Sequence, residues 1–234
     1  MVEPARPAAL SLQELPRNVE GSLMSRDNIL HKVRTALGRS AGQAVAPPPP
    51  VRLRIPEVPM EARIESFITR LEVLAGKAVR VGTMEEACQF VALAIAGKTA
   101  AASNAPYLAE CGITGLPGVR SGIRDLAELR EVCATVDIGI TSADYMLGDT
   151  GTLVTIASPA EARLMSLLPP AHLAVVPKER MLTGLDELFT VVPHPAEITS
   201  SMVLITGPSR TADIEQILVR GVHGPGNVTV VIVG

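Results

Sequence analysis

From residue 60 to the C-terminus, segments with the apolar spacing of a helix alternate with short runs of apolar residues. "MEARIESFITRLEVLAG" (60–76) places apolar residues three and four apart, which predicts an amphipathic helix. Similar spacing predicts helices over 84–97, 123–134 and 158–168. Between the helices lie short, nearly all-apolar runs rich in β-branched residues, at 77–82, 98–103, 135–141, 151–158, 171–177, 201–207 and 228–234. Strands without polar alternation must be covered on both faces, so the pattern predicts an α/β fold with a mostly parallel sheet flanked by helices.

Two segments allow more specific predictions, one about a helix start and one about a βαβ unit. In the helix expected over 158–168, Ser158 suits the N-cap, Pro159 the first helical position and Glu161 the third, which is a capping-box arrangement. The C-terminal segment from Val203 to Val233 has the length of a strand, a helix and a second strand in a βαβ unit.

The first 59 residues have a different character. Residues 1–60 contain 9 of the 19 prolines, and "AVAPPPPVRLRIPEVP" (44–59) favours an extended polyproline spacer. Before it, "SRDNILHKVRTALGR" (25–39) has helical spacing, with Ser25 as the expected N-cap and Gly38 as the expected stop. We therefore expect a tail, a short helix and a Pro-rich linker over 1–59, followed by one α/β domain over 60–234.

Composition narrows the function classes. The net charge of −3, the aromatic content of 2% and the absence of Trp argue against nucleic-acid binding, which needs basic and stacking surfaces. The 3 cysteines and 4 histidines lack metal-ligand spacing, so we expect no metal and no cofactor bound by this chain. No apolar run reaches the length of a membrane span or a signal peptide, which predicts a soluble, cytoplasmic protein.

The stretch "ITGPSRTADIE" (205–215) is one candidate for ligand binding. A predicted strand ends at Thr206, the chain turns at Gly207, and a helix is expected to begin near Ser209. Free amides at a helix N-terminus attract anions, and a guanidinium can bind a carboxylate or phosphate. We therefore expect Gly207, Ser209, Arg210 and Thr211 to bind a small anion. The alternative is that Ser209 only caps the helix and Arg210 pairs with Asp213 or Glu215.

A second candidate lies within "GITSADYMLGDTGTLVTIASP" (139–159), where polar residues interrupt two apolar strands. Polar groups next to a core are costly unless they bond to each other or to a ligand. Asp149 is the candidate acid, base or nucleophile of this stretch, and Thr150, Gly151 and Thr152 are candidate ligand-binding residues. The alternative is a turn in which Asp149 bonds only to backbone amides.

Histidines and strand ends supply the remaining candidates. His223 lies in the Gly-rich "GVHGPGN" and is a second candidate proton acceptor, while His172 is expected just before a strand. A lone histidine is more often structural than catalytic. "SNAPYL" places Ser103 and Asn104 directly after a predicted strand, where ligands of α/β sheets bind.

Three of these segments together resemble the lactate-utilisation protein C family, whose members carry a LUD domain. They are "ITSADYMLGDTGTLV", "RLMSLLPPAHLAVVP" and "ITGPSRTADIEQILVRGVHGP". The resemblance implies a fold like that of the sugar-phosphate isomerase and CoA-transferase group (NagB/RpiA-like). It also implies a part in oxidising L-lactate to pyruvate beside iron–sulfur partner proteins, which would hold the clusters. The family usually has Glu where this chain has Asp149.

The leading functional expectation is a component of an L-lactate utilisation system that binds a small carboxylate or phosphate. Oxidation of lactate needs a base and an electron acceptor, and the chain offers only candidate bases, so it is not expected to act alone. Two alternatives remain open: an independent enzyme of CoA-transferase or sugar-phosphate type, and a non-catalytic regulatory or assembly subunit.

Overall fold

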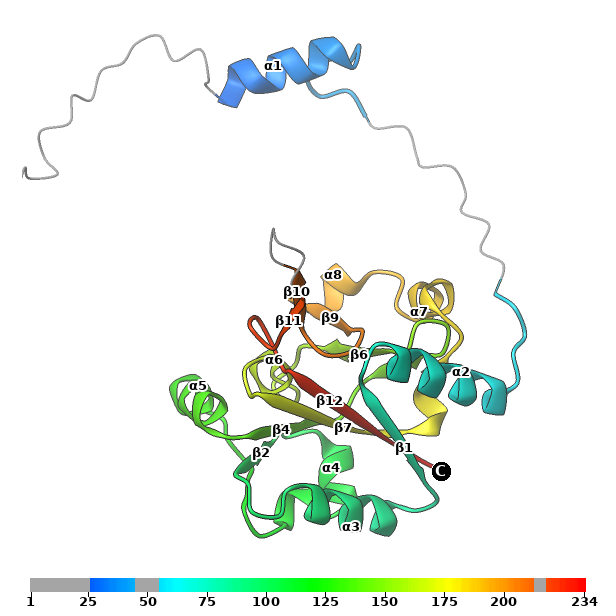
Figure 1. Cartoon of the computed structure of the whole chain (residues 1–234). Helices are drawn as coiled ribbons and strands as arrows, with labels where there is room; N and C mark the ends of the chain where they lie inside the picture. Colours follow the sequence, from blue (N-terminus) through cyan, green and yellow to red (C-terminus); the bar gives the residue numbers. More distant parts are fainter. Residues whose placement is uncertain (1–25, 45–54, 213–217) are drawn as a thin grey trace, which may run out of the picture. The chain divides into compact units, whose positions relative to one another are not determined.

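The computed structural model of the chain describes residues 26–44, 55–212 and 218–234 (Figure 1). The chain divides into two units, residues 1–52 and 53–234, which are described separately. In the first unit, α1 (Arg26–Ala36) is an 11-residue helix. The backbone of Gly38 has a φ of +62°, so the predicted stop is confirmed, because this left-handed conformation ends helices. Ser25, the expected cap, lies outside the described residues.

The second unit is built on a six-stranded sheet in which every pair of neighbours is parallel (Figure 1). Its spatial order is β1 (Lys77–Val81), β12 (Asn227–Val233), β7 (Ala171–Pro177), β4 (Ile138–Thr141), β2 (Ala100–Ala102) and β3 (Val119–Arg120). Apart from β3, and from Asn227 at the start of β12, these strands fall within the predicted apolar runs. The prediction of an α/β fold with a parallel sheet flanked by helices is confirmed.

Helices cover both faces of this sheet, which explains the nearly all-apolar strands. On one face pack α3 (Met84–Ala94), α4 (Pro106–Glu110) and the 3-10 helix η1 (Ile113–Gly115). On the other pack α2 (Met60–Val73), α5 (Leu126–Thr135) and α6 (Arg163–Leu167). Phe67 of α2 is fully buried against this second face, as the spacing of its helix predicts.

A second, four-stranded sheet packs on the α2 side of the first. Its order is β8 (Met181–Leu182), β5 (Tyr145–Leu147), β6 (Thr152–Ile156) and β9 (Met202–Ile205), with β6 antiparallel to both neighbours. Along the chain, the 3-10 helix η2 (Lys178–Arg180) precedes β8. The helices α7 (Leu185–Val191) and α8 (Pro195–Ile198) follow β8 and precede β9. Strands of two or three residues, such as β5 and β8, are too short to show a period in the sequence.

The prediction that a helix begins near Ser209 is wrong. Residues 210–212 form β10 (Arg210–Ala212), which pairs antiparallel with β11 (Leu218–Arg220). The backbone N–H of Ser209 donates to the carbonyl of Pro225 at 2.9 Å, and the N–H of Gly221 donates to the carbonyl of Ser209 at 3.0 Å. These contacts hold the chain extended, so tertiary pairing overrides a weak local helix signal. Residues 213–217 lie outside the described residues.

The predicted C-terminal βαβ unit is also wrong, because β9 belongs to the second sheet and β12 to the first. A third correction concerns α6, which begins at Arg163 rather than directly after Ser158. The hydroxyl of Ser158 accepts from the N–H of Glu161 at 3.0 Å, but residues 158–161 form an isolated turn. The side chain of Glu161 therefore does not complete a capping box.

Candidate functional site

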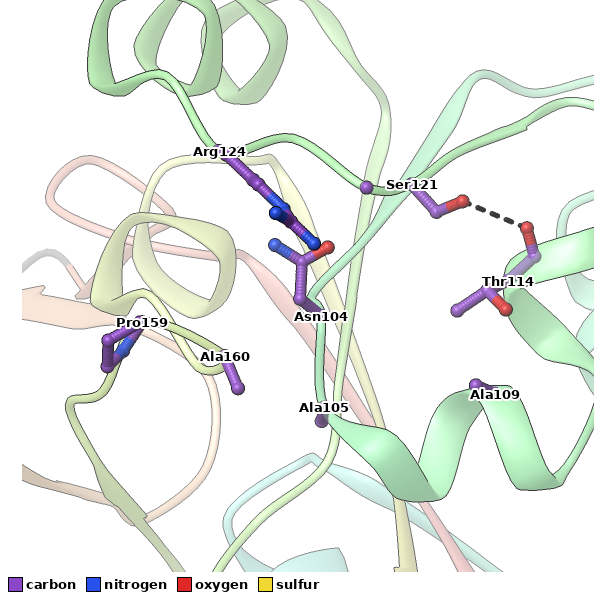
Figure 2. Close-up of a pocket in the computed structure, with 9 residues that line it drawn as sticks. Asn104, Ala105, Ala109, Thr114, Ser121, Arg124, Pro159 and Ala160 are labelled. Atoms are coloured by element: carbon purple, nitrogen blue, oxygen red, sulfur yellow. Dashed lines mark hydrogen bonds between the residues drawn. The ribbon is translucent and has the colours of Figure 1, made fainter.

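Several cavities lie at the carboxyl ends of β2 and β4, which is the edge of a parallel α/β sheet where ligands bind. One of them, here called the outer cleft, has a volume of about 690 Å³ (Figure 2). It is lined by Asn104, Ala105, Ala109, Thr114, Ser121, Gly122, Arg124, Pro159 and Ala160. These residues come from the segments after β2, before α5 and after β6.

The outer cleft contains one charged side chain, Arg124, and no carboxylate among its lining residues. Figure 2 shows Arg124 and Asn104 pointing toward one another across the cleft. The amide nitrogen of Asn104 donates to the carbonyl of Ile123 at 2.7 Å, which fixes its side chain. The hydroxyl of Ser121 donates to the carbonyl of Thr114 at 3.0 Å. A cation among small polar and apolar groups is suited to a small anion.

A second cavity, here called the inner cavity, has a volume of about 180 Å³. It is lined by Ala105, Pro106, Tyr107, Glu110, Ser142, Asp144, Ser158, Ala160, Glu161 and Arg180. Ala105 and Ala160 line both the inner cavity and the outer cleft. The two cavities are therefore adjacent, and we call them together the strand-end site.

Glu161 is the most perturbed acid of the strand-end site. Its side chain is buried, and Oε2 accepts from the hydroxyl of Ser103 at 3.0 Å and from the N–H of Ser142 at 3.3 Å. Its Oε1 is buried with no hydrogen-bond partner among the described residues. The pKa of Glu161 is raised to about 8, chiefly by burial. The hydrogen bonds from Ser103 and Ser142 and the charge of Arg180 oppose this shift, while the Asp144 carboxylate adds to it. At neutral pH the carboxyl group is therefore mainly protonated.

Arg180 is held rigidly at the wall of the inner cavity. Its Nη1 donates to the hydroxyl of Ser142 at 3.1 Å and to the carbonyl of Ala143 at 2.5 Å. Its guanidinium lies 5.7 Å from the centre of the Tyr107 ring. Asp144 lies on the same wall, where Oδ2 accepts from the N–H of Ile156 at 2.6 Å, and burial raises its pKa. The inner cavity thus combines the cation Arg180 with two carboxyl groups, Asp144 and Glu161, whose charged form is disfavoured, and it is also lined by Glu110.

The polar residues predicted around Asp149 lie elsewhere, in the turn between β5 and β6. Their hydroxyls form a chain in which Thr152 Oγ1 bonds to Thr150 Oγ1 and to Thr206 Oγ1, both at 2.8 Å. The hydroxyl of Thr150 donates to the exposed Asp149 carboxylate at 3.2 Å. Gly151 has a φ of +66° and packs against the end of α2, where a Cβ would lie 2.6 Å from the N of Leu71. None of these residues lines the strand-end site.

The residues predicted as an anion cradle neighbour this turn. Gly207 has a φ of +82°, and the guanidinium of the exposed Arg210 donates to the carbonyl of Leu74 at the end of α2. The ligand-binding function predicted for Gly207, Ser209, Arg210 and Thr211 stays a prediction, without the helix N-terminus on which it was based. His223 is exposed, in a turn whose Gly224 lies against Ser209.

His172 lies within β7 rather than before it, and it is buried. Its Nε2 lies 2.7 Å from Thr141 Oγ1, and burial lowers its pKa to about 4. A buried, neutral imidazole bonded to a neighbouring strand is a structural histidine. Over the described residues, no group of three or more His, Cys, Asp or Glu is placed to hold a metal ion. Nor does any described helix combine the length and hydrophobicity that crossing a bilayer demands.

The sequence indicated Ser103 and Asn104 correctly as polar groups at a strand end, but it missed Glu161, Arg124 and Arg180. Glu161 fitted a capping box so well that the local pattern concealed its burial. Arg124 and Arg180 stand in short segments before α5 and β8, where a single arginine looks like any surface cation. The missed residues become informative only when the sheet brings their segments together.

Comparisons with known proteins agree with the fold. Residues 64–233 match the family model of the LUD domain. The chain is similar to Lactate utilization protein C of Exiguobacterium sp. AT1b, with 40% identity over 108 residues, covering 44% of this chain and 47% of that protein. It is 33% identical over 157 residues to Lactate utilization protein C of Halalkalibacterium halodurans, covering 64% of this chain and 68% of that protein. The first of these matches therefore spans about half of the relative's length.

A solved structure shows the same fold at lower identity. The crystal structure of a DUF162 family protein from Deinococcus radiodurans superposes with a TM-score of 0.58 and 17% identity. The superposition covers 76% of this chain and 100% of that chain. At this identity, the likeness supports the arrangement of the sheet and helices and nothing about the ligand.

Proposed function

Since the chain belongs to the LUD domain family, we propose that it is a component of an L-lactate utilisation system, in which lactate is oxidised to pyruvate. We place its ligand, a small carboxylate or phosphate, in the strand-end site. The names of its relatives support the metabolic setting, since they are called Lactate utilization protein C. Iron–sulfur proteins are the proposed partners that supply the electron acceptor, because a base alone cannot remove the hydride equivalent of lactate.

One observation carries the placement of the ligand: Arg124 is the single charged residue of the outer cleft. An anion in this cleft meets a cation and no opposing carboxylate, and Arg124 has no ion-pair partner among the described residues. Nearby Arg120 differs, since it pairs with Glu128 at 3.2 Å. A guanidinium that is not already neutralised is free to form charge-assisted hydrogen bonds to a ligand.

The test is a binding titration of the purified chain with pyruvate, L-lactate and inorganic phosphate. Arg124→Gln should weaken binding of the preferred anion about tenfold. This loss is at the low end of the range for hydrogen bonds to charged groups, because Arg124 is exposed to solvent. Arg130→Gln is the matched control, since Arg130 is an exposed arginine of α5 that does not line the cleft. Unchanged binding by Arg124→Gln, with a loss in Arg210→Gln, would place the ligand at the turn after β9 instead.

The same variants test the metabolic setting. A host strain that lacks the gene should lose growth on L-lactate and keep growth on pyruvate. The unaltered chain and Arg130→Gln should restore growth, while Arg124→Gln should restore it poorly. Normal growth of the deletion strain on L-lactate as the sole carbon source would refute the assignment to lactate utilisation.

A further inference from the structure

One side chain that lines the inner cavity has an oxygen atom without a hydrogen-bond partner in the part of the chain that the structure describes. Glu161 is 8% exposed, and its Oε1 is buried without a partner among the described residues. Buried polar atoms in native proteins nearly always have a partner, and leaving one without costs stability. The Glu161 side chain is among those lining the inner cavity, so a bound ligand can supply the missing contact.

The contacts of the other oxygen decide which hydrogen bond Oε1 can make. Oε2 accepts twice, from the Ser103 hydroxyl and from the Ser142 N–H. The Ser103 hydroxyl itself accepts from the N–H of Ala105 at 3.5 Å, which directs its proton toward Glu161. With Oε2 acting as the acceptor, the proton of the neutral carboxyl group resides on Oε1. A residue that lines the cavity therefore carries an O–H donor that lacks an acceptor among the described residues.

We propose that Glu161 acts as a neutral carboxylic acid and donates a hydrogen bond from Oε1 to the carbonyl or hydroxyl oxygen of a small oxo or hydroxy acid. The proposal rests on the proposed function for the presence of such a ligand. It adds the residue that recognises the carbonyl or hydroxyl oxygen outside the carboxylate. This contact would distinguish an oxo or hydroxy acid from a simple carboxylic acid. The inner cavity has a volume of about 180 Å³ and adjoins the outer cleft that contains Arg124.

The charged surroundings of Glu161 agree with a protonated acid. From the segment after β4, Asp144 disfavours a second negative charge, and burial acts in the same direction. From η2, Arg180 favours the charged form, but its Nη1 is already engaged by Ser142 and Ala143. Tyr107 and Glu110 of α4 also line the cavity, and burial raises the pKa of Tyr107, which keeps it neutral.

The experiment measures pyruvate binding between pH 6.5 and 9 for the unaltered chain, Glu161→Gln and Glu161→Leu. Glutamine reproduces the neutral acid, with its carbonyl facing Ser103 and its NH₂ facing the ligand, and it does not titrate. Glu161→Gln should bind within about threefold of the unaltered chain at pH 6.5, and Glu161→Leu at least about tenfold more weakly. The unaltered chain should bind about tenfold more weakly at pH 9 than at pH 7, while Glu161→Gln shows no such change.

Propionate is the matched control ligand, because it has the carbon skeleton and carboxylate of pyruvate but lacks the keto oxygen. All three proteins should bind propionate alike. A loss of pyruvate binding in Glu161→Gln as large as in Glu161→Leu would overturn the inference, since it would show that the ionised carboxylate is required.

A titration of Glu161 itself, with and without pyruvate, separates the two proposals. The ¹³C resonance of the Glu161 carboxyl carbon should titrate near pH 8, and pyruvate should raise this midpoint, because binding and protonation favour each other reciprocally. Pyruvate binding with a Glu161 midpoint near the ordinary value of 4.5 would refute this inference alone. A midpoint near 8 with no binding of any small acid would refute the proposed function, and with it the ligand assigned to Glu161.

Discussion

The domain contains two polar regions that differ in how their hydrogen bonds are completed. In the turn region, Asp149–Thr152 and Thr206–Arg210, hydroxyl groups bond to one another and Arg210 bonds to the backbone of α2. In the strand-end site, Glu161 keeps one oxygen without a partner, and Arg124 has no ion-pair partner among the described residues. The turn region has the more conspicuous sequence, yet the strand-end site has the groups available to a ligand.

This difference shows that polar density along the sequence is a poor guide to a binding site. Thr150, Thr152 and Thr206 stabilise a turn by satisfying each other, so a ligand would gain little from them. Glu161 and Arg124 are separated by more than thirty residues, and each looks unremarkable in its own segment. The structure is informative because it shows which polar atoms remain unpaired after folding.

The largest expected effect concerns a glycine that supports the strand-end site. A Cβ on Gly139 of β4 would lie 2.0 Å from the carbonyl oxygen of Met165 and 2.9 Å from Pro169 Cγ. Since backbone cannot move aside easily, Gly139→Ala should lower the free energy of unfolding by about 3 kcal/mol, measured by urea denaturation. The variant separates α6 from β4 and thereby strains the turn that carries Glu161.

Gly184 is the matched position beside the turn region. There a Cβ would lie 2.3 Å from Asp149 Oδ2, but that side chain is exposed and can rotate away. Gly184→Ala should therefore cost less than about 1 kcal/mol. Gly115→Ala, where no atom lies within 4 Å of the new Cβ, is the neutral control. Equal losses in Gly139→Ala and Gly184→Ala would contradict the expected difference between a contact with backbone and a contact with an exposed side chain.

A smaller effect is expected in the pH dependence of stability. The native chain keeps the Glu161 proton up to about pH 8, whereas the unfolded chain releases it near the ordinary value of 4.5. The native state therefore binds more protons in this window, and its stability falls as pH rises. Between pH 6.5 and 8, Glu161 should lower the free energy of unfolding by roughly 2 kcal/mol, a slope that Glu161→Gln removes.

His172 acts in the opposite direction at lower pH. Its native pKa of about 4 lies below the ordinary 6.5, so its contribution is present above pH 6.5 and is lost as pH falls toward 4. The comparison with Glu161→Gln is therefore best made above pH 6.5. Asp149→Asn, which removes an exposed carboxylate, should leave the slope unchanged. A slope that persists in Glu161→Gln would show that another group causes it.

Much of the fold could be predicted from the sequence, because α2 and α3 have strong helical periodicity and most strands of the parallel sheet are short, nearly all-apolar runs. Strands β5 and β8 could not, since two or three residues define no period, and their pairing depends on distant partners. The start of the antiparallel pair β10 and β11 was mistaken for a helix, because capping residues at a turn resemble a helix start. Ser209 and Thr211 suit either conformation locally, and tertiary pairing decides between them.

The candidate site was predictable only in part. Ser103 and Asn104 follow an all-apolar strand, so topology alone places them at the carboxyl edge of the sheet. The position of Glu161 depends on α6 beginning at Arg163, which leaves the acid in a turn that packs against Ser103 and Ser142. No local pattern specifies that contact, because it joins residues 58 positions apart.

Chemical-shift mapping of the backbone amides during a pyruvate titration tests most directly whether the ligand occupies the strand-end site. The largest shifts are expected at Ser103–Ala105, Ser142, Glu161 and Arg124, with the amides of Asp149–Thr152 and Thr206–Arg210 nearly unchanged. Shifts concentrated in the turn region, with the amides around Glu161 unmoved, would contradict the account.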